Sequence, residues 1–133
     1  MPALFLEKPK ITLLYKYYLF GDLTCLEQEK EAAETEKQQA KIDWLFNCLT
    51  KEEYLINKIE SKLKIGWSFS RLPPLEKATL IYATHEILFN SRIPAPSLIT
   101  QIIHFSKKYL ESDKYKYINK ILDLLFKEKQ KII

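Results

Sequence analysis

Tyrosines and lysines alternate along residues 107–120, the stretch of this sequence whose residue types could do chemistry. Aromatic rings stack on the unpaired bases of single-stranded RNA and cations follow its phosphates, so the pattern is typical of an RNA-binding surface. A plainer interpretation stays open, in which Tyr109 and one other tyrosine pack in the core and the lysines solvate helix ends. The stretch contains the tyrosines Tyr109, Tyr115 and Tyr117 and the lysines Lys107, Lys108, Lys114, Lys116 and Lys120.

The rest of the sequence contains no motif that indicates a catalytic or metal-binding site. His85 and His104 lie nineteen residues apart on different predicted helices, and neither has a partner at metal-ligand spacing. The carboxylates are expected to cap helices or face solvent, and no pair of them is arranged for acid–base chemistry. The sequence also lacks a glycine-rich phosphate loop and a nucleophile motif. We therefore expect no catalytic residue, no metal and no cofactor.

The charge is distributed unevenly along the chain. The net charge is +4, but residues 1–66 carry ten lysines against eleven acidic residues, a balance of −1. Residues 67–133 carry nine lysines and two arginines against six acidic residues, a balance of +5. This asymmetry permits a surface that binds a polyanion, although a general enrichment in lysine would produce it equally well.

The compartment is predicted to be the cytoplasm. Cys25 and Cys48 have no close partner and no metal-binding spacing, and we expect both to be reduced thiols on helices. No stretch is apolar enough to cross a membrane, and residues 1–10 lack the features of a secretory signal. We expect no membrane association.

Helical periodicity and capping signals predict the elements of the first third. Apolar residues at helical spacing indicate a helix over 11–20 that ends at Gly21. Thr24, with Glu27 three positions later, is predicted to cap the segment that follows. That segment reaches Leu49 and is expected to be solvated in its first half and packed in its second.

A second capping box is predicted at Thr50 with Glu53, at the start of a helix that ends near Gly66. The two tryptophans, Trp44 and Trp67, are expected to be core anchors. None of these segments shows the alternation of apolar and polar residues that a strand requires.

Residues 75–89 predict the central element of the fold. Nine of these fifteen residues are apolar and they occupy nearly every face of a helix, so other helices must surround it. Pro73-Pro74 suits its first turn, and His85 within it is expected to be packed or at an edge. Two more helices are predicted after Pro94 and after Asp113. The sequence therefore predicts an all-α bundle of six or seven helices, forming one domain over residues 1–133.

The second half carries, in order, the motifs Leu75-Glu76-Lys77-Ala78, His85-Glu86-Ile87, Ile93-Pro94 and Lys116-Tyr117-Ile118-Asn119, and this order resembles the NusB family. The family's Val-Glu-Lys/Arg-Ala helix start is matched by Leu75-Glu76-Lys77-Ala78, and its Tyr-Glu-Leu by His85-Glu86-Ile87. Its Ile/Val-Pro turn corresponds to Ile93-Pro94. The last helix carries Lys116-Tyr117-Ile118-Asn119, where the family has Lys-Phe/Tyr-Val-Asn. Upstream, Leu14-Tyr15 is similar to the family's Ala-Leu-Tyr.

Resemblance to NusB implies a transcription antitermination factor that binds boxA-like single-stranded RNA. It also implies the ribosomal protein NusE as a partner, and we expect a monomer or weak homodimer. The residues that the resemblance places on the RNA are Tyr15, Lys107, Asp113, Lys116 and Tyr117, and the residue that it places on the protein partner is Glu76.

The chain departs from the family at its N-terminus. The family is rich in arginine there, whereas no arginine precedes Arg71, and Glu7 is expected to repel phosphate. Lysine binds phosphate without the bidentate fork of arginine. These departures favour an alternative, a protein-interaction module that keeps the NusB fold and has lost RNA binding. A third interpretation is a stand-alone relic of the N-terminal part of a ribosomal-RNA methyltransferase.

Overall fold

The computed structural model describes residues 5–21, 24–89 and 93–131, apart from the side chains of Cys25, Leu26 and Glu29. All regular structure in these residues is helical, with seven α-helices and one short 3-10 helix. The predicted all-α class with six or seven helices is confirmed. In chain order the elements are α1 (Lys8–Phe20), α2 (Thr24–Ala32), α3 (Glu36–Leu49), α4 (Glu52–Glu60), η1 (Phe69–Arg71), α5 (Pro74–Phe89), α6 (Ala95–Tyr109) and α7 (Lys114–Lys131).

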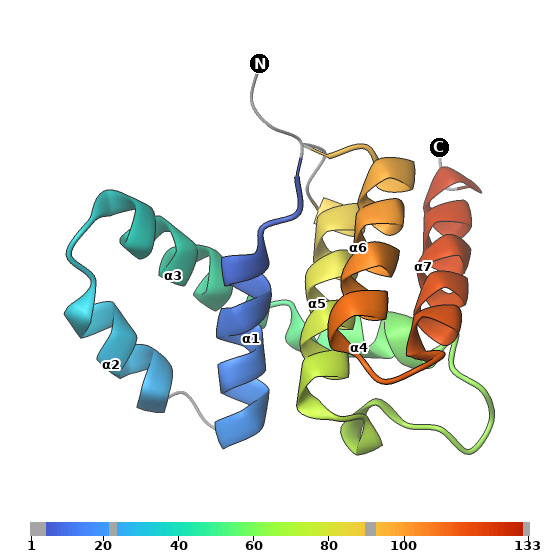
Figure 1. Ribbon diagram of the computed structural model, residues 1–133, viewed down its shortest axis with the longest axis horizontal. Helices are drawn as coiled ribbons and strands as arrows, with labels where there is room; N and C mark the ends of the chain where they lie inside the picture. Colours follow the sequence, from blue (N-terminus) through green and yellow to red (C-terminus); the bar gives the residue numbers. More distant parts are fainter. Residues whose placement is uncertain (1–4, 22–23, 90–92, 132–133) are drawn as a thin grey trace.

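Helix α5 lies at the centre of the bundle. Every side chain from Ala78 to Ile87 is buried. Helices α1, α4, α6 and α7 pack around it, and Figure 1 shows it between α1 on one side and the α6–α7 pair on the other. A helix that is apolar on nearly all faces is stable in water only when other helices cover it. The predicted central helix is confirmed, with Pro74 in its first turn.

Helices α5, α6 and α7 run alternately up and down in Figure 1. The N-terminal end of α5, the C-terminal end of α6 and the N-terminal end of α7 therefore lie at the same end of the bundle. Helix α4 crosses behind them and contacts α5 and α7. Helices α2 and α3 lie on the far side of α1 from α5 (Figure 1). This arrangement brings the lysine-rich segments of α6 and α7 together.

The predicted segment over 24–49 is two helices rather than one. Its break falls at Thr35, which has extended backbone angles (φ −122°, ψ 158°) and caps α3. The Thr35 hydroxyl accepts a hydrogen bond from the backbone N–H of Gln38 at 3.1 Å, and the Gln38 side chain accepts one from the backbone N–H of Thr35 at 3.2 Å. This is a capping box, in which two groups each satisfy one free backbone donor. Thr24, predicted to be the cap, is the first residue of α2 itself.

The capping box predicted at Thr50 and Glu53 is wrong. Thr50 ends α3 with helical backbone angles, and its hydroxyl donates back to the carbonyl of Asn47 at 2.6 Å. Helix α4 begins at Glu52 without a side-chain cap and ends at Glu60, before the predicted end near Gly66. An N-cap residue must leave the helical conformation. Helices α3 and α4 follow each other too closely for Thr50 to do so. The predicted stop at Gly21 is confirmed, with a left-handed φ of 77°.

Polar side chains are also buried around α5. His85 is 6% exposed, lies 3.1 Å from a carboxylate oxygen of the neighbouring Glu86, and contacts the ring of Trp44. His85, expected to be packed or at an edge, is therefore packed inside the bundle, and Trp44 is partly buried against the core. Cys48 is a buried free thiol, and burial, with the charge of Glu86, raises its pKa to about 12. The side chain of Cys25, the other predicted thiol, lies outside the described residues.

The described helices do not meet the requirements of a membrane span. None of them is both long enough and apolar enough to cross a bilayer.

Replacing Thr35 with alanine should destabilise the protein by about 0.5–2 kcal/mol, because α3 loses its N-terminal cap. Thr50→Ala is the matched control, since Thr50 is also a threonine at an end of α3 but caps no N-terminus. Urea denaturation of both variants measures the difference in the free energy of unfolding. Equal losses for the two variants would contradict the assignment of the cap.

Candidate nucleic-acid interface

The turn between α6 and α7 brings the C-terminal end of one helix to the N-terminal end of the next. Both helices pack on α5 and on each other. The ammonium of Lys107 on α6 lies 4.8 Å from the ring centroid of Tyr115 on α7, in a cation–π contact that joins the two helices. Lys107 is exposed and Tyr115 is half-buried. The contact with Tyr115 therefore holds the Lys107 ammonium in place while the side chain stays exposed to solvent.

Asp113 occupies this turn in a left-handed backbone conformation, with φ of 69°. Aspartate is one of the few residues besides glycine that adopt this conformation readily. Its backbone carbonyl accepts a hydrogen bond from the N–H of Lys116 at 3.1 Å, and its carboxylate lies 3.5 Å from the Lys116 ammonium. Both side chains are exposed. Such a pair contributes little to stability, and both groups stay accessible.

Tyr117 connects α7 to the start of α5. Its hydroxyl donates a hydrogen bond to the carboxylate of Glu76. Glu76 is 3% exposed. Burial raises the pKa of Tyr117, and the hydrogen bond to Glu76 and the negative charge of Glu76 raise it further. The tyrosine is therefore a neutral donor that satisfies a buried carboxylate.

This contact joins two residues for which the family resemblance implies different partners. Glu76 was predicted to face a protein and Tyr117 to face RNA, and each touches the other. Because Glu76 is buried, it offers almost no surface of its own. Tyr117 is half-buried and lies between Glu76 and the surface groove described below.

Tyr15 lies apart from the other predicted RNA-binding residues. It is on α1, half-buried, and its ring packs against the core. Figure 1 shows α1 and α7 on opposite sides of α5. The predicted residues therefore form one group at the α6–α7 turn and a separate position on α1.

Tyr109 is on the surface, contrary to the interpretation that placed it in the core. It is 46% exposed and packs one face on Phe105. The ammonium groups of Lys108 and Lys8 lie 5.3 Å and 5.6 Å from its ring centroid. A hydrogen bond from Lys108 and the positive charges of Lys108 and Lys8 lower the pKa of Tyr109. An exposed ring between two cations is thus added to the same end of α6.

Glu7, predicted to repel phosphate, carries a charge that a neighbour compensates. Its carboxylate lies 2.6 Å from the ammonium of Lys10, and its backbone N–H donates to the Tyr82 hydroxyl at 2.8 Å. The opposite charges lie close together, so the field that a phosphate meets near Glu7 is weaker than that of an isolated carboxylate.

Trp67 is on the surface as well, so its prediction as a core anchor is wrong. It is 48% exposed and lies on the segment between α4 and η1. It lines a groove together with residues of α7, and we call this groove the Trp67 groove. Its lining residues are Lys62, Leu63, Lys64, Trp67, Tyr117, Lys120 and Ile121. The clue in the sequence is that Trp67 directly follows Gly66, outside any run of apolar residues at helical spacing.

Glu128 fixes α7 to α4 beside this groove. Its carboxylate oxygens lie 2.9 Å from the Lys58 ammonium and 2.6 Å from the Lys62 ammonium. The hydrogen bonds from Lys62 and Lys58 lower the pKa of Glu128 to about 2. Two lysines on one carboxylate form a small charge network between helices that are far apart in sequence.

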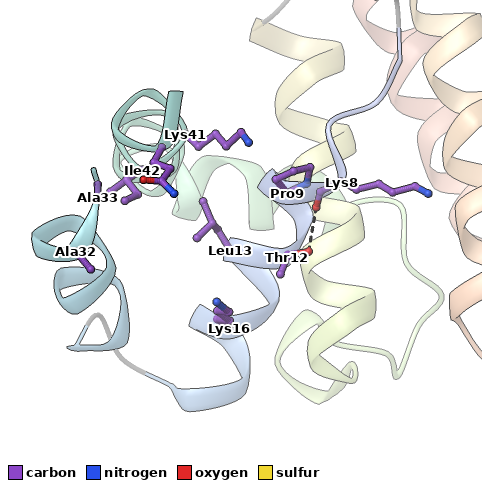
Figure 2. A pocket seen from close by; sticks show the side chains of 10 residues that line it. Lys8, Pro9, Thr12, Leu13, Lys16, Ala32, Ala33, Lys41 and Ile42 are labelled. Atoms are coloured by element: carbon purple, nitrogen blue, oxygen red, sulfur yellow. Dashed lines mark hydrogen bonds between the residues drawn. The ribbon is translucent and has the colours of Figure 1, made fainter. Parts of the chain in front are cut away.

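A larger cavity lies on another part of the molecule, between α1 and the α2–α3 turn. It has a volume of about 520 Å³, within the range of small-molecule sites. Figure 2 shows Leu13 pointing from α1 toward Ile42 of α3, while the Lys8 side chain extends away. The residues that line it are mostly apolar or lysine, and none is among the predicted site residues. Within the described part of the chain, no three His, Cys, Asp or Glu residues gather in a way that could hold a metal ion.

The sequence matches a known family over most of its length. The profile of the NusB family matches residues 12–127, a range that includes every predicted site residue. This chain belongs to the NusB family.

Individual NusB relatives cover the chain to different extents. The Transcription antitermination protein NusB of Methylacidiphilum infernorum is 34% identical over 82% of this chain and 71% of the relative. The protein of the same name from Fervidobacterium nodosum is 38% identical over 55% of this chain and 52% of the relative. That of Desulfitobacterium hafniense is 37% identical over 56% of this chain and 50% of the relative. For the last two NusB proteins, the match spans about half of their length.

Replacing Tyr117 with phenylalanine should lower the free energy of unfolding by about 1–3 kcal/mol, because the buried Glu76 carboxylate loses its donor. Tyr115→Phe removes a hydroxyl from the same turn of α7 that makes no hydrogen bond within the described residues, so little change is expected. Urea denaturation of both variants tests this. A loss for Tyr115→Phe as large as that for Tyr117→Phe would refute the role of the Tyr117–Glu76 contact.

Replacing Glu128 with glutamine should destabilise the protein at neutral pH and destabilise it less at about pH 3. The pKa of Glu128 is about 2 in the folded chain against 4.5 ordinarily, so its contribution is full above about 4.5 and disappears as the pH falls toward 2. Denaturation at neutral pH and at about pH 3 compares the variant with the wild type.

Asp123→Asn is the control for this measurement. Asp123 pairs with Lys127 at 3.0 Å within α7, and at least half of each side chain is exposed; such surface pairs contribute little. A Glu128→Gln difference that stays constant across this pH range would contradict the charge network.

Proposed function

We propose that this NusB-family protein is a transcription antitermination factor that binds boxA-like single-stranded RNA, alone or with the ribosomal protein NusE. Its matched relatives are named transcription antitermination proteins. The observation that supports RNA binding most directly is the group of lysines and tyrosines around the α6–α7 turn, because this group combines exposed cations with accessible rings.

Each component of this group suits a part of a single RNA strand. Lys107, Lys108 and Lys116 are exposed and would contact phosphates. The Tyr109 ring, 46% exposed, offers a face on which a base can stack. Lysine lacks the fork of arginine, so these contacts add charge attraction with little directional preference.

Asp113 would contribute recognition rather than charge attraction. A carboxylate accepts hydrogen bonds from the amino groups on the Watson–Crick edges of unpaired bases. The left-handed turn holds Asp113 at the exposed tip between α6 and α7. Its pair with Lys116 reduces the repulsion that a lone carboxylate would exert on the phosphates.

The remaining predicted residues would act in other ways. Tyr15 would supply a separate contact from α1. Glu76 would position Tyr117 through their hydrogen bond. Its effect on a partner protein at this end of the bundle would therefore be indirect, through the position of the Tyr117 side chain. In this proposal the protein and RNA surfaces adjoin at the N-terminal end of α5.

Replacing Lys116 with alanine should weaken binding of a boxA-like RNA and reduce the salt dependence. Each phosphate contact to a single strand contributes a slope of about −0.7 to a plot of log affinity against log salt concentration, so the slope should become shallower by about that amount. Fluorescence anisotropy of labelled RNA across a salt series, with and without NusE, gives both quantities.

Lys127→Ala is a closely matched control. Lys127 lies on the same helix, its side chain is 63% exposed against 66% for Lys116, and it also pairs with an aspartate. Its replacement should leave the affinity and the slope nearly unchanged, because it lies toward the other end of α7. No RNA binding by the wild type at low salt, even with NusE, would overturn the proposal in favour of a protein-interaction module.

A further inference from the structure

Trp67 is a large apolar side chain that the bundle leaves half uncovered. It is 48% exposed. Its ring centroid lies 5.8 Å from that of Tyr117, with the rings inclined at 57°. The loop that carries it passes beside the N-terminal end of α7 (Figure 1). One edge of the indole is therefore fixed by Tyr117, while much of its surface stays in contact with water.

Cations surround this exposed ring. The Lys114 ammonium lies 5.9 Å from the Trp67 ring centroid. Lys62, Lys64 and Lys120 line the Trp67 groove, and no acidic residue is among its lining residues. Of these, Lys62 is held by Glu128 at 2.6 Å, while Lys64 and Lys120 are exposed. The groove thus combines an aromatic platform with a net positive rim.

The size of the groove limits what it can hold. Its volume is about 80 Å³, far below the roughly 300–1,000 Å³ of sites that enclose a small molecule or cofactor. Leu63 and the buried Ile121 contribute apolar surface to the lining. Such a small groove fits a flat group lying against the tryptophan rather than a ligand enclosed on all sides.

We propose that the Trp67 groove is a nucleotide subsite, in which an unpaired base of the RNA stacks on Trp67 and the adjoining phosphates contact Lys64, Lys114 and Lys120. Stacking on an aromatic ring beside a line of cations is the general way in which proteins hold single strands. This subsite rests on the proposed RNA-binding function, and Tyr117 belongs to both. A strand at the α6–α7 turn would continue into the groove past Tyr117.

A protein ligand fits the groove less well. Lysine is depleted at protein–protein interfaces, and their buried centres carry few charges. Here, four lysines lie beside one tryptophan and no carboxylate lines the site. The charge pattern therefore matches a polyanion, and a bound protein becomes one of the outcomes of the test.

The experiment measures RNA affinity and the environment of Trp67 separately. Anisotropy of a labelled boxA-like RNA reports affinity for the wild type, Trp67→Ala and Trp67→Phe. We expect Trp67→Ala to weaken binding by roughly five- to a hundredfold, which is the usual effect of removing the aromatic side chain on which a base stacks. Trp67→Phe should weaken binding less, because it keeps an aromatic ring. Because Trp67 is half exposed, its replacement should leave the fold intact, which circular dichroism checks.

A second measurement uses the fluorescence of Trp67 itself. The chain has two tryptophans, so Trp44→Phe leaves Trp67 as the only one, and unlabelled RNA should quench its emission. If Trp44→Phe fails to fold, the difference between wild-type and Trp67→Phe emission gives the same signal. In addition, Lys64→Ala and Lys120→Ala should each make the salt slope shallower by about 0.7. Lys37→Ala, an exposed lysine on α3, is the control.

The outcomes separate this inference from the proposed function. RNA binding with quenched Trp67 emission and weakened binding by Trp67→Ala would support the subsite. Normal RNA binding by Trp67→Ala, with unchanged Trp67 emission, would overturn the subsite and leave the proposed function standing. A change in Trp67 emission on adding NusE but not RNA would overturn it in favour of a protein contact. No RNA binding by any form of the protein would overturn both.

Discussion

The burial of α5 is the constraint on which the rest of this structure depends. Ten consecutive side chains, from Ala78 to Ile87, are removed from water, and each fully buried large aliphatic side chain contributes about 1.5–3 kcal/mol. No single neighbour can cover a helix on all faces, so α1, α4, α6 and α7 must surround it. The α6–α7 hairpin is therefore placed by α5, and so are the lysines at its turn.

Burial of α5 also brings polar groups inside, where they need partners. Thr79 donates to the carbonyl of Leu75 at 2.7 Å within its own helix. The carboxylate of Glu76, in the first turn of α5, accepts a hydrogen bond from the Tyr117 hydroxyl of α7. This last bond has a second consequence, because it fixes one edge of the surface at which we propose that RNA binds. A requirement of the core thus positions a residue of the interface.

The arrangement of charges separates structural lysines from those available to a ligand. Glu128 holds Lys58 and Lys62, and Glu7 holds Lys10. By contrast, the lysines of the α6–α7 turn contact aromatic rings or an exposed aspartate, so their charges are less compensated. Under the proposed function, these less compensated lysines of α6 and α7 would contact the RNA phosphates.

Local sequence patterns determined the helical class, the central position of α5, the stop at Gly21 and the NusB family, because apolar periodicity, helix-stop residues and motif order are written along the chain. They did not distinguish Thr35 from Thr24 or Thr50 as a cap, because a capping box depends on where the backbone leaves the helix. The surface positions of Tyr109 and Trp67, and the Tyr117–Glu76 bond across 41 residues, were decided only by tertiary structure. Burial and pairing depend on which helices pack together, and the faces that stay open are those that remain after α5 has been covered.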